Sequence, residues 1–451
     1  MTQQLPMSQP DQTQAATESS SLSPTYRSYA LALLVVVNVF NYLDRQILSI
    51  LLESIKRDLQ LSDTALGFLT GIAFALFYTF AGVPIARWAD RGTRRTIMAL
   101  GLAVWSGMTA LTGLARSFTQ LALARIGVGV GEAACSPPAH SLLSDYFPPE
   151  RRGTALSIFS LGVPIGIMIG YLVGGWINQY FGWRTAFFVV GLPGLLLAVV
   201  VRLTLREPPR GHSEGPQTST SVTPVDSFPD VLRFMWRLRS FRHLSLAAAL
   251  HALYGYGVLA FMPAFMMRVH GMTNTAELGL WLGLIAGVFS GIGTFLGGTL
   301  GDRFAAREKD MRWYMWLPAW ATILSIPFTC LFYLWPEGRT ALLLSIPSAI
   351  LGPTYIGPTM AMTQGLVKLR MRATASAILL FILNLIGLGL GPQAVGVLSD
   401  LLVPTYGTQS IRYALLFVVV IGSMWSSMHY FLAARTLRED LKAKDGFVGG
   451  R

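Results

Sequence analysis

Hydrophobic and polar positions alternate along this chain in long blocks. Apolar runs of about 20 residues recur from one end to the other, and each is long enough to cross a hydrocarbon core about 30 Å thick. Glycine and proline within them are tolerated in membrane helices. The pattern predicts an all-α membrane protein with twelve transmembrane helices, at residues 28–52, 64–86, 95–115, 119–144, 153–176, 184–204, 243–267, 277–300, 313–335, 340–365, 373–399 and 412–434.

One long polar segment divides these runs into two sets of six, and two polar tails flank them. Residues 1–27 and 437–451 are predicted as cytoplasmic tails, the first of them disordered. Residues 206–240 form the longest polar interruption and are predicted as a cytoplasmic linker between bundles at 28–205 and 241–436. The linker ends in VLRFMWRLRS, a basic amphipathic stretch expected to lie along the inner membrane surface.

The charge distribution agrees with a membrane protein and requires no nucleic-acid partner. Hydrophobic residues make up 52% of the chain and charged residues 13%, with a net charge of +12. With the N-terminus inside, most lysines and arginines fall on the cytoplasmic side, as the positive-inside rule expects. The two cysteines, Cys135 and Cys330, both lie in predicted spans, which excludes a disulfide framework or a cysteine metal cluster. We expect a monomer without metal or cofactor.

The two halves carry matching signatures. ARWADRGTRR (86–95) follows the second span, and GTLGDRFAAR (298–307) follows the eighth. RGTALS (152–157) opens the fifth span, and RATASA (372–377) opens the eleventh. Six spans repeated around a long loop are typical of a secondary transporter built from two related bundles.

The loop after the second span resembles the signature loop of the major facilitator superfamily. That resemblance implies a cytoplasmic gate fastened by these charges, although they are also typical of loops that only set topology. The usual glycine is replaced by Ala86, and Arg307 is shifted by one place in the second copy. The gate candidates are Asp90, Arg91, Arg94 and Arg95 in the first copy and Asp302 and Arg303 in the second.

Residues 125–175 narrow the resemblance to the Spinster family. The stretch contains G-x-G-E-A-x-x-S-P, then D-x-F-P-x-x-x-R, then G-x-P-x-G-x-x-x-G-Y-x-x-G-G, and NYLDR (41–45) adds to it. The match covers most of the first half, whereas the second half shows only general superfamily features. The resemblance implies a protein that moves sphingosine-phosphate or lysophospholipid-like molecules. Because no organelle-targeting signal is found in the sequence, we expect a bacterial homologue in the inner membrane. NYLDR alone also resembles organic-anion symporters of the superfamily.

Two acidic residues, Asp44 and Glu132, fall deep within predicted spans. Asp44 lies about 22 Å along the first helix and Arg125 about 10 Å into the fourth from the opposite side, which brings them to a similar depth. We therefore predict an Asp44–Arg125 pair. Arg125 and Glu132 share one helical face, and Asn41 is one turn from Asp44. A charge at this depth requires a partner or water.

This polar track predicts proton coupling. Burial favours the neutral carboxylic acid, and a nearby guanidinium favours the carboxylate, so making and breaking a pair can load and release a proton. Glu132 is the preferred proton carrier because no arginine is adjacent in its own helix, and Asp44 is expected to respond to Arg125. Arg45 points about 100° away from Asp44, toward another helix or an anionic head group. The Spinster resemblance implies the same residues. The alternative is a purely structural ion pair.

The second half contributes polar side chains but no buried acid. Its candidates are Tyr254, Tyr256, Tyr355, Gln364, Asn384 and Gln393, with His251 in mid-span. This asymmetry favours an amphipathic substrate with its polar head near Arg45 and Arg125. The substrate-binding candidates are Asn41, Arg45, Arg125, Glu132, Tyr254, Tyr355 and Asn384.

The sequence therefore predicts a proton-coupled transporter of a lipid-like or amphipathic anion that works by alternating access. The partners expected are membrane lipids, protons and that substrate. Two alternatives remain: a proton symporter of small organic anions such as sugar acids, and a ligand sensor that does not transport. No G-x-x-x-x-G-K-[ST], H-E-x-x-H or G-x-S-x-G is present, so we expect no enzymatic activity.

Overall fold

The computed structural model describes residues 23–210, 228–368 and 371–446. Within these ranges the regular structure is helical, without strands. In the described part of the chain, eight segments are long and apolar enough to cross a membrane: Pro24–Leu59, Asp63–Arg91, Pro149–Thr204, Arg239–Val269, Thr275–Glu308, Trp313–Leu334, Gly338–Gly365 and Arg372–Lys442. The prediction of an all-α integral membrane protein is confirmed.

Eight helices are found in the described part of the first half, residues 23–210. They are α2 (Pro24–Leu59), α3 (Asp63–Thr70), α4 (Ile72–Arg91), α5 (Arg94–Thr112), α6 (Phe118–Glu132), α7 (Ser136–Tyr146), α8 (Pro149–Ser160) and α9 (Gly162–Thr204).

The second half begins with the short helix α10 (Phe228–Arg237). It continues with α11 (Arg239–Val269), α12 (Thr275–Gly283), the π-helix η1 (Leu284–Phe289), α13 (Ser290–Glu308), α14 (Trp313–Leu334), α15 (Gly338–Leu351), the 3₁₀-helix η2 (Gly352–Tyr355), α16 (Ile356–Gly365), α17 (Arg372–Ile382), the π-helix η4 (Leu383–Leu390), α18 (Gly391–Tyr406), the 3₁₀-helix η5 (Gly407–Gln409) and α19 (Ser410–Gly446).

Several long apolar runs are interrupted for identifiable reasons. Gly182 has φ 80°, a left-handed conformation that breaks α9 into two helices. Pro137 and Pro138 lack an N–H, and α6 ends at Glu132 before α7 resumes at Ser136. The π-helix η4 interrupts the run between α17 and α18. Such breaks place irregular backbone inside the molecule, where transporters commonly bind ligands.

The start of the first helix differs from the predicted boundary of the N-terminal tail. Helix α2 starts at Pro24 because Ser23 caps its first turn by accepting a hydrogen bond from the backbone N–H of Tyr26, so the predicted tail 1–27 is too long. Its residues 1–22 lie outside the described residues, as do 211–227 of the predicted linker and 447–451 of the C-terminal tail. The part of that tail up to Gly446 is helical.

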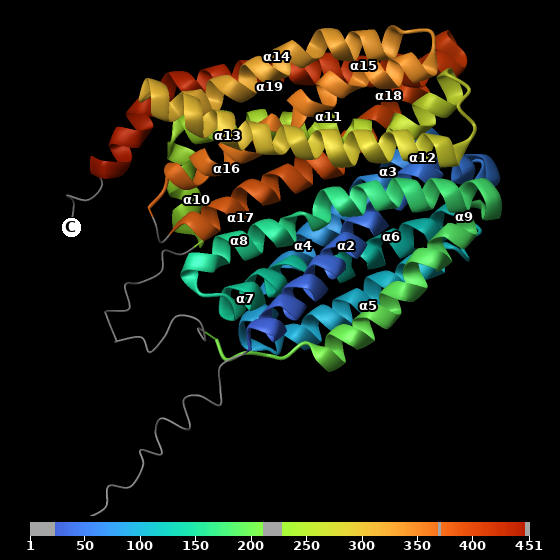
Figure 1. Ribbon diagram of the computed structural model, residues 1–451. Helices are drawn as coiled ribbons and strands as arrows, with labels where there is room; N and C mark the ends of the chain where they lie inside the picture. Colours follow the sequence, from blue (N-terminus) through green and yellow to red (C-terminus); the bar gives the residue numbers. More distant parts are fainter. Residues whose placement is uncertain (1–22, 211–227, 369–370, 447–451) are drawn as a thin grey trace, which may run out of the picture.

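The helices form two groups that lie side by side (Figure 1). In the first group, α2 and α5 both pack against α9; in the second, α11 and α14 pack against α19. Small residues allow the close approach of α9 to α2, because a Cβ at Gly166 would lie 2.5 Å from the carbonyl oxygen of Val39. We call the end of the molecule that carries α3 and α12 the α3 end, and the opposite end, with α7, α8 and α10, the α10 end (Figure 1).

Candidate functional site

Asp44 is buried in α2, and only one of its carboxylate oxygens is hydrogen-bonded. The residue is 2% exposed, and its Oδ2 accepts a hydrogen bond of 2.5 Å from the hydroxyl of Thr109 on α5. Its Oδ1 has no hydrogen-bond partner among the described residues. A buried polar atom without a partner is costly, so a proton or a donor from a ligand at this oxygen would be stabilised.

Arg45 and Glu132 form an ion pair that joins α2 to the end of α6. Arg45 Nε lies 2.6 Å from Glu132 Oε2, and the Glu132 side chain is fully buried. Three aromatic rings surround the guanidinium, with centres at 5.1 Å (Tyr42), 4.8 Å (Phe74) and 4.6 Å (Tyr78) from its Cζ. Because each distance is in the cation–π range, these rings also hold the Arg45 charge in place.

Arg125 lies beside the Phe74 ring of this cluster, and no ion pair to it is found among the described residues. Its Cζ is 5.0 Å from the Phe74 ring centre, and its Nε has no hydrogen-bond partner among the described residues. No ion pair between Arg125 and Asp44 is found in the part of the chain that the structure describes. The predicted Asp44–Arg125 pair is therefore wrong for this conformation, because Asp44 binds Thr109 while Phe74 lies beside Arg125.

Two features of this cluster escaped sequence reasoning. One is the ring cage of Tyr42, Phe74 and Tyr78, whose only sequence signal is the four-residue spacing of Phe74 and Tyr78 on one helical face. The other is Thr109, an ordinary hydroxyl in an apolar run. Asn41, which was predicted to take part, is 2% exposed in α2, and its Nδ2 has no hydrogen-bond partner among the described residues.

The candidates of the second half gather mainly around His251. The Tyr254 hydroxyl lies 2.7 Å from His251 Nδ1, and the His251 ring stacks on Tyr355 with centres 4.0 Å apart. Asn384 is half-buried in the π-helix η4. Tyr256 instead packs against the cluster of the first half that contains Phe74 and Tyr78. The two halves therefore meet at aromatic side chains close to Arg45.

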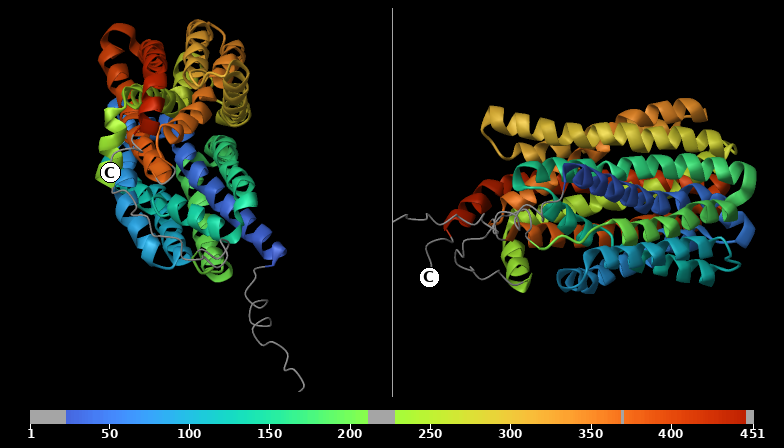
Figure 2. Two further views of the ribbon diagram at one scale, coloured as in Figure 1. Left: turned by 90° about the vertical axis from the view of Figure 1, so that its left-hand side faces the viewer. Right: turned by 60° about the horizontal axis from the view of Figure 1, so that its bottom comes forward.

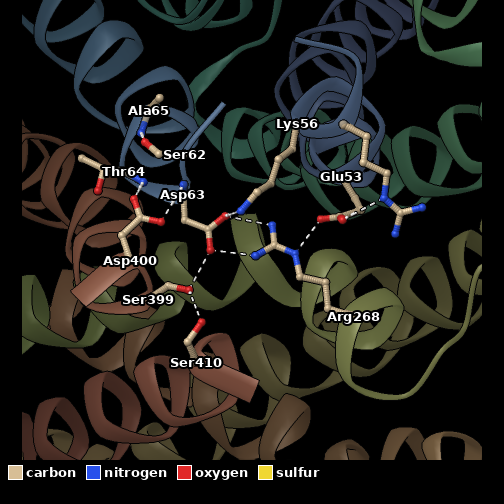
Figure 3. Close-up of polar contacts among 11 residues, drawn as sticks. Glu53, Lys56, Ser62, Asp63, Thr64, Ala65, Arg268, Ser399, Asp400 and Ser410 are labelled. Atoms are coloured by element: carbon tan, nitrogen blue, oxygen red, sulfur yellow. Dashed lines mark hydrogen bonds and ion pairs between the residues drawn. The ribbon is translucent and has the colours of Figure 1, made fainter. Parts of the chain in front are cut away.

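A second polar cluster, which was not predicted from the sequence, joins the halves at the α3 end (Figure 3). Arg268 of α11 donates from Nε to Glu53 Oε2 at 2.6 Å. Its Nη1 and Nη2 donate to the two carboxylate oxygens of Asp63 at 2.7 and 2.9 Å. Lys56 Nζ lies 2.6 Å from Asp63 Oδ1, and the Ser399 hydroxyl donates to Asp63 Oδ2. The guanidinium thus binds two acidic residues of the opposite half.

Asp400 extends this cluster to the N-terminus of α3. Its carboxylate accepts hydrogen bonds from the backbone N–H groups of Asp63 at 3.0 Å and Thr64 at 2.7 Å. These donors begin a helix and would otherwise lack partners, and the helix dipole also favours a negative charge there. A carboxylate of α18 therefore caps a helix of the first half (Figure 3).

The gate candidates of the first half are arranged differently from the prediction. Arg94 is buried, forms an ion pair with Asp145, and donates from Nε to Glu207 Oε1 at 2.7 Å. Arg95 donates its backbone N–H to Glu207 as well. Asp145 lies in α7 and Glu207 comes shortly after α9, so both partners belong to the first half. The Arg94 contacts therefore do not join the two halves in this conformation.

The remaining gate candidates are exposed at the α10 end. Asp90 and Arg91 end α4 at the surface, and no ion pair involves either of them in the described ranges. Asp302 accepts a hydrogen bond of 2.7 Å from Tyr314 of its own half, and Arg303 is exposed. The hydrogen bonds that Asp63, Thr64, Tyr171, Thr275 and Arg268 form between the halves all lie away from these motifs.

Outside the spans, Asp310 ties the loop before α14 to α19. Its Oδ2 accepts hydrogen bonds of 2.8 Å from Arg312 and from Arg438. The hydrogen bonds from Arg312 lower the pKa of the Asp310 carboxyl to about 2. Burial acts in the opposite direction, but its effect is smaller. This loop is thus an ordered connection at the α10 end.

Comparison with known proteins adds to this geometry. The family model described as Major Facilitator Superfamily matches residues 34–392. The chain belongs to the major facilitator superfamily. An MFS-type efflux pump of Mycolicibacterium smegmatis is 35% identical over 414 residues, covering 91% of this chain and 94% of that protein. The sphingosine-1-phosphate transporter SPNS2 of Mus musculus is 27% identical over 435 residues, covering 90% of this chain and 78% of that protein.

A solved structure gives a close match over nearly the whole chain. A bacterial homologue of the human lysosomal transporter Spinster, in an inward-facing and unoccupied conformation, matches with a TM-score of 0.85 and 34% sequence identity. The match covers 93% of this chain and 99% of the other. The predicted resemblance to Spinster proteins is confirmed, and the family and fold are those of transporters.

Proposed function

We propose that this protein is a proton-coupled secondary transporter that moves an amphipathic anion by alternating access. The observation that carries the proposal is the Arg45–Glu132 pair, whose Glu132 side chain is fully buried and which joins α2 to α6 beside a second buried acid, Asp44. Charges inside a membrane protein are costly, and in transporters they commonly mark ion pathways. The buried pair lies beside aromatic residues at which the two halves meet.

The membrane arrangement that we propose has twelve spans in two bundles, 28–205 and 241–436. Of the eight apolar segments, Pro149–Thr204 and Arg372–Lys442 contain 56 and 71 residues, and a single span needs only about 20. Gly182 and η5 divide them, and α5 and the α6–α7 pair supply the two further spans. The start of α2 at Pro24 and the end of α19 at Gly446 then both lie at the α10 end, which we assign to the cytoplasmic side of a bacterial inner membrane, so we propose that both termini are cytoplasmic.

This assignment makes the structure an inward-facing state. The polar contacts of Arg268, Asp63 and Asp400 close the α3 end, which becomes the outer side, whereas the motif residues Asp90 and Arg91 are exposed at the inner side. We propose that Asp90, Arg91, Arg94, Arg95, Asp302 and Arg303 fasten the inner gate only in the outward-facing state. The similarity to an inward-facing Spinster homologue supports this reading.

Proton coupling follows because Arg45 and a proton compete for the carboxylate of Glu132. While Arg45 is paired with it, Glu132 is stabilised as a carboxylate. When the pair separates, a buried carboxylate at the C-terminal end of α6 lacks a partner and faces the negative end of the helix dipole, so it takes up a proton. Arg45 then becomes available to an anion together with Arg125, whose Nε has no partner among the described residues. Asp44, held by Thr109, is the second protonation site.

The substrate that best fits this site is an amphipathic anion. Two guanidinium groups lie beside aromatic rings in the first half, and the candidates of the second half are aromatic or uncharged. An anionic head would bind at Arg45 and Arg125, and an apolar tail would lie against the second half. Similarity to a sphingosine-1-phosphate transporter supports a lysolipid, and similarity to an efflux pump supports export.

The test is uptake of a labelled anionic lysolipid into proteoliposomes with an imposed pH gradient. We expect uptake that depends on the gradient in the natural protein and loses this dependence in Glu132→Gln. Glu308→Gln, at an exposed residue of α13, is the matched control and should behave like the natural protein. Transport of sugar acids but not lysolipids would favour the small-anion symporter, and binding without any transport would favour a sensor.

A further inference from the structure

The helix α10 is separate from the transport site and has a surface of its own. It lies across the ends of the spanning helices in both Figure 1 and Figure 2. Val231 and Met235 are fully buried, in a cluster with Phe241 of α11 and Ala375 and Ile378 of α17. One face of α10 is therefore fixed to the second half, and the helix cannot turn freely at the surface.

The rest of the α10 surface is divided into an apolar sector and a basic sector. At 100° per residue, Phe228, Leu232 and Trp236 form a stripe directly beside the buried face. Phe228 and Trp236 are 56% and 55% exposed. Arg233 and Arg237 follow next around the helix, and the Arg233 side chain is 65% exposed. Around the circumference of α10, the face buried against the protein is therefore followed by the exposed apolar sector and then by the basic sector.

The segment that contains this helix is strongly positive, and Asp440 of α19 lies against it at the backbone N–H of Ser240. Residues 228–242 contain Arg233, Arg237, Arg239 and Arg242, all exposed, and one acidic residue, Asp230. Asp230 lies 3.2 Å from Arg233 as an ion pair on the helix surface. Among the described residues, no ion pair is found for Arg237, Arg239 or Arg242. An anionic partner would complement these groups.

We propose that α10 is a binding site for the head groups of anionic phospholipids in the membrane leaflet at the α10 end. Exposed tryptophan and phenylalanine beside arginine match the membrane interface, where rings lie at the level of the head groups and arginines reach phosphates. An acidic protein segment would match the arginines but leave the apolar stripe exposed to water. A phospholipid leaflet complements both sectors at once.

This site has a structural consequence for the second half. Because α10 packs on α17, lipids bound to α10 hold the end of α17 at the membrane surface. Helix α17 continues into η4, which contacts α4 of the first half. Anionic lipid is thus expected to stabilise the position of the second half at this end, independently of protons and substrate.

The test compares phosphatidylglycerol with phosphatidylcholine bound to the purified full-length protein, counted by native mass spectrometry. Each arginine near an anionic surface contributes about fivefold, so Arg233→Gln with Arg237→Gln should weaken phosphatidylglycerol binding about 25-fold. Arg307→Gln, at an arginine of α13 whose side chain is 75% exposed, is the matched control and should leave binding unchanged. Equal binding of both lipids, or unchanged binding by the double variant, would overturn the proposal.

A second measurement tests the depth of the helix. Brominated phosphatidylglycerol should quench the fluorescence of the natural protein in bilayer nanodiscs more than that of Trp236→Phe, because Trp236 lies in the exposed apolar sector. Identical fractional quenching in the two proteins would show that this sector does not reach the lipid, and it would also overturn the proposal. Neither result depends on transport, so the outcome is independent of the proposed function.

Discussion

Closure of the α3 end depends on a backbone contact that a single methyl group should disturb. Gly279 of α12 faces α9 so closely that a Cβ there would lie 2.3 Å from the carbonyl oxygen of Tyr171. The reciprocal position is equally tight, since a Cβ at Gly175 would lie 2.3 Å from the carbonyl oxygen of Thr275. Because both neighbours are backbone atoms, no side chain can move aside.

The distance between the added Cβ and the carbonyl oxygen sets the energetic cost of Gly279→Ala. Ordinary contact begins at 3.4 Å, so Gly279→Ala must separate α9 from α12 by about 1 Å in the closed state. Overpacking of this kind costs about 1–3 kcal/mol. If the opened state relieves the clash, the equilibrium constant between the closed and opened states of the α3 end shifts toward the opened state by about 5- to 150-fold. The matched control is Gly298→Ala in α13, where a Cβ would meet nothing within 4 Å.

Double electron–electron resonance measures this shift. Spin labels at Phe181 and Leu401, which are 60% and 69% exposed, report the distance between the halves at the α3 end. Cys135 and Cys330 are replaced by alanine in all variants. Gly279→Ala should add or enlarge a longer-distance population, whereas Gly298→Ala should match the parent protein. The same distance distribution in both variants would refute the reasoning that this seam closes the outer side.

Three further predictions concern the charges. Arg268→Gln removes the cation that Glu53 and Asp63 share across the two halves, leaving Arg57 on Glu53 and Lys56 on Asp63. Loss of one partner from a buried ion pair costs at most about 3–5 kcal/mol, so the melting temperature should fall and the same spin-label distance should widen, with Arg268→Lys intermediate; an unchanged distance would contradict this. Phe74→Leu removes a ring that holds Arg45 and should shift the pH profile of transport, whereas Phe74→Tyr should retain it; identical profiles would exclude a positioning role. Asp310 has a lowered pKa of about 2, so its contribution to stability is present above about pH 4 and is lost as the pH falls through about 2. Asp310→Asn should therefore lower the melting temperature at pH 7 by more than at pH 2, and an equal difference at both would contradict the assignment.

The helical membrane fold could be predicted from sequence because it depends on a pattern that is continuous along the chain. Runs of about 20 apolar residues leave little choice other than helices, since a membrane requires every backbone group to be paired internally. Helix ends were less accurate. Ser23 starts α2 earlier than polarity indicates, and Gly182 breaks α9 through a single left-handed residue.

The charged residues of the candidate site were identifiable, but their pairing was not. Depth along a helix brought Asp44 and Arg125 to one level, yet it contains no information about which way each side chain turns. In the structure Arg45 reaches Glu132, and Thr109 binds Asp44. Rotations of this kind depend on neighbouring rings such as Phe74, which the sequence marks only as apolar.

The cluster at the α3 end was missed for a related reason. Asp63 and Arg268 are 205 positions apart, and each lies near the end of an apolar run where a charge is expected anyway. Nothing local distinguishes such a residue from one that faces solvent. Only the packing of α3 and α18 shows that Asp63 is buried and shared between the halves.

If the Arg45–Glu132 pair couples protons to substrate, a substrate gradient alone should drive proton movement. Proteoliposomes containing a pH-sensitive dye receive an anionic lysolipid gradient without any imposed pH difference. The account predicts a change in internal pH with the natural protein and with Glu308→Gln, and none with Glu132→Gln. A full pH change in Glu132→Gln, at the natural rate of lysolipid transport, would contradict it.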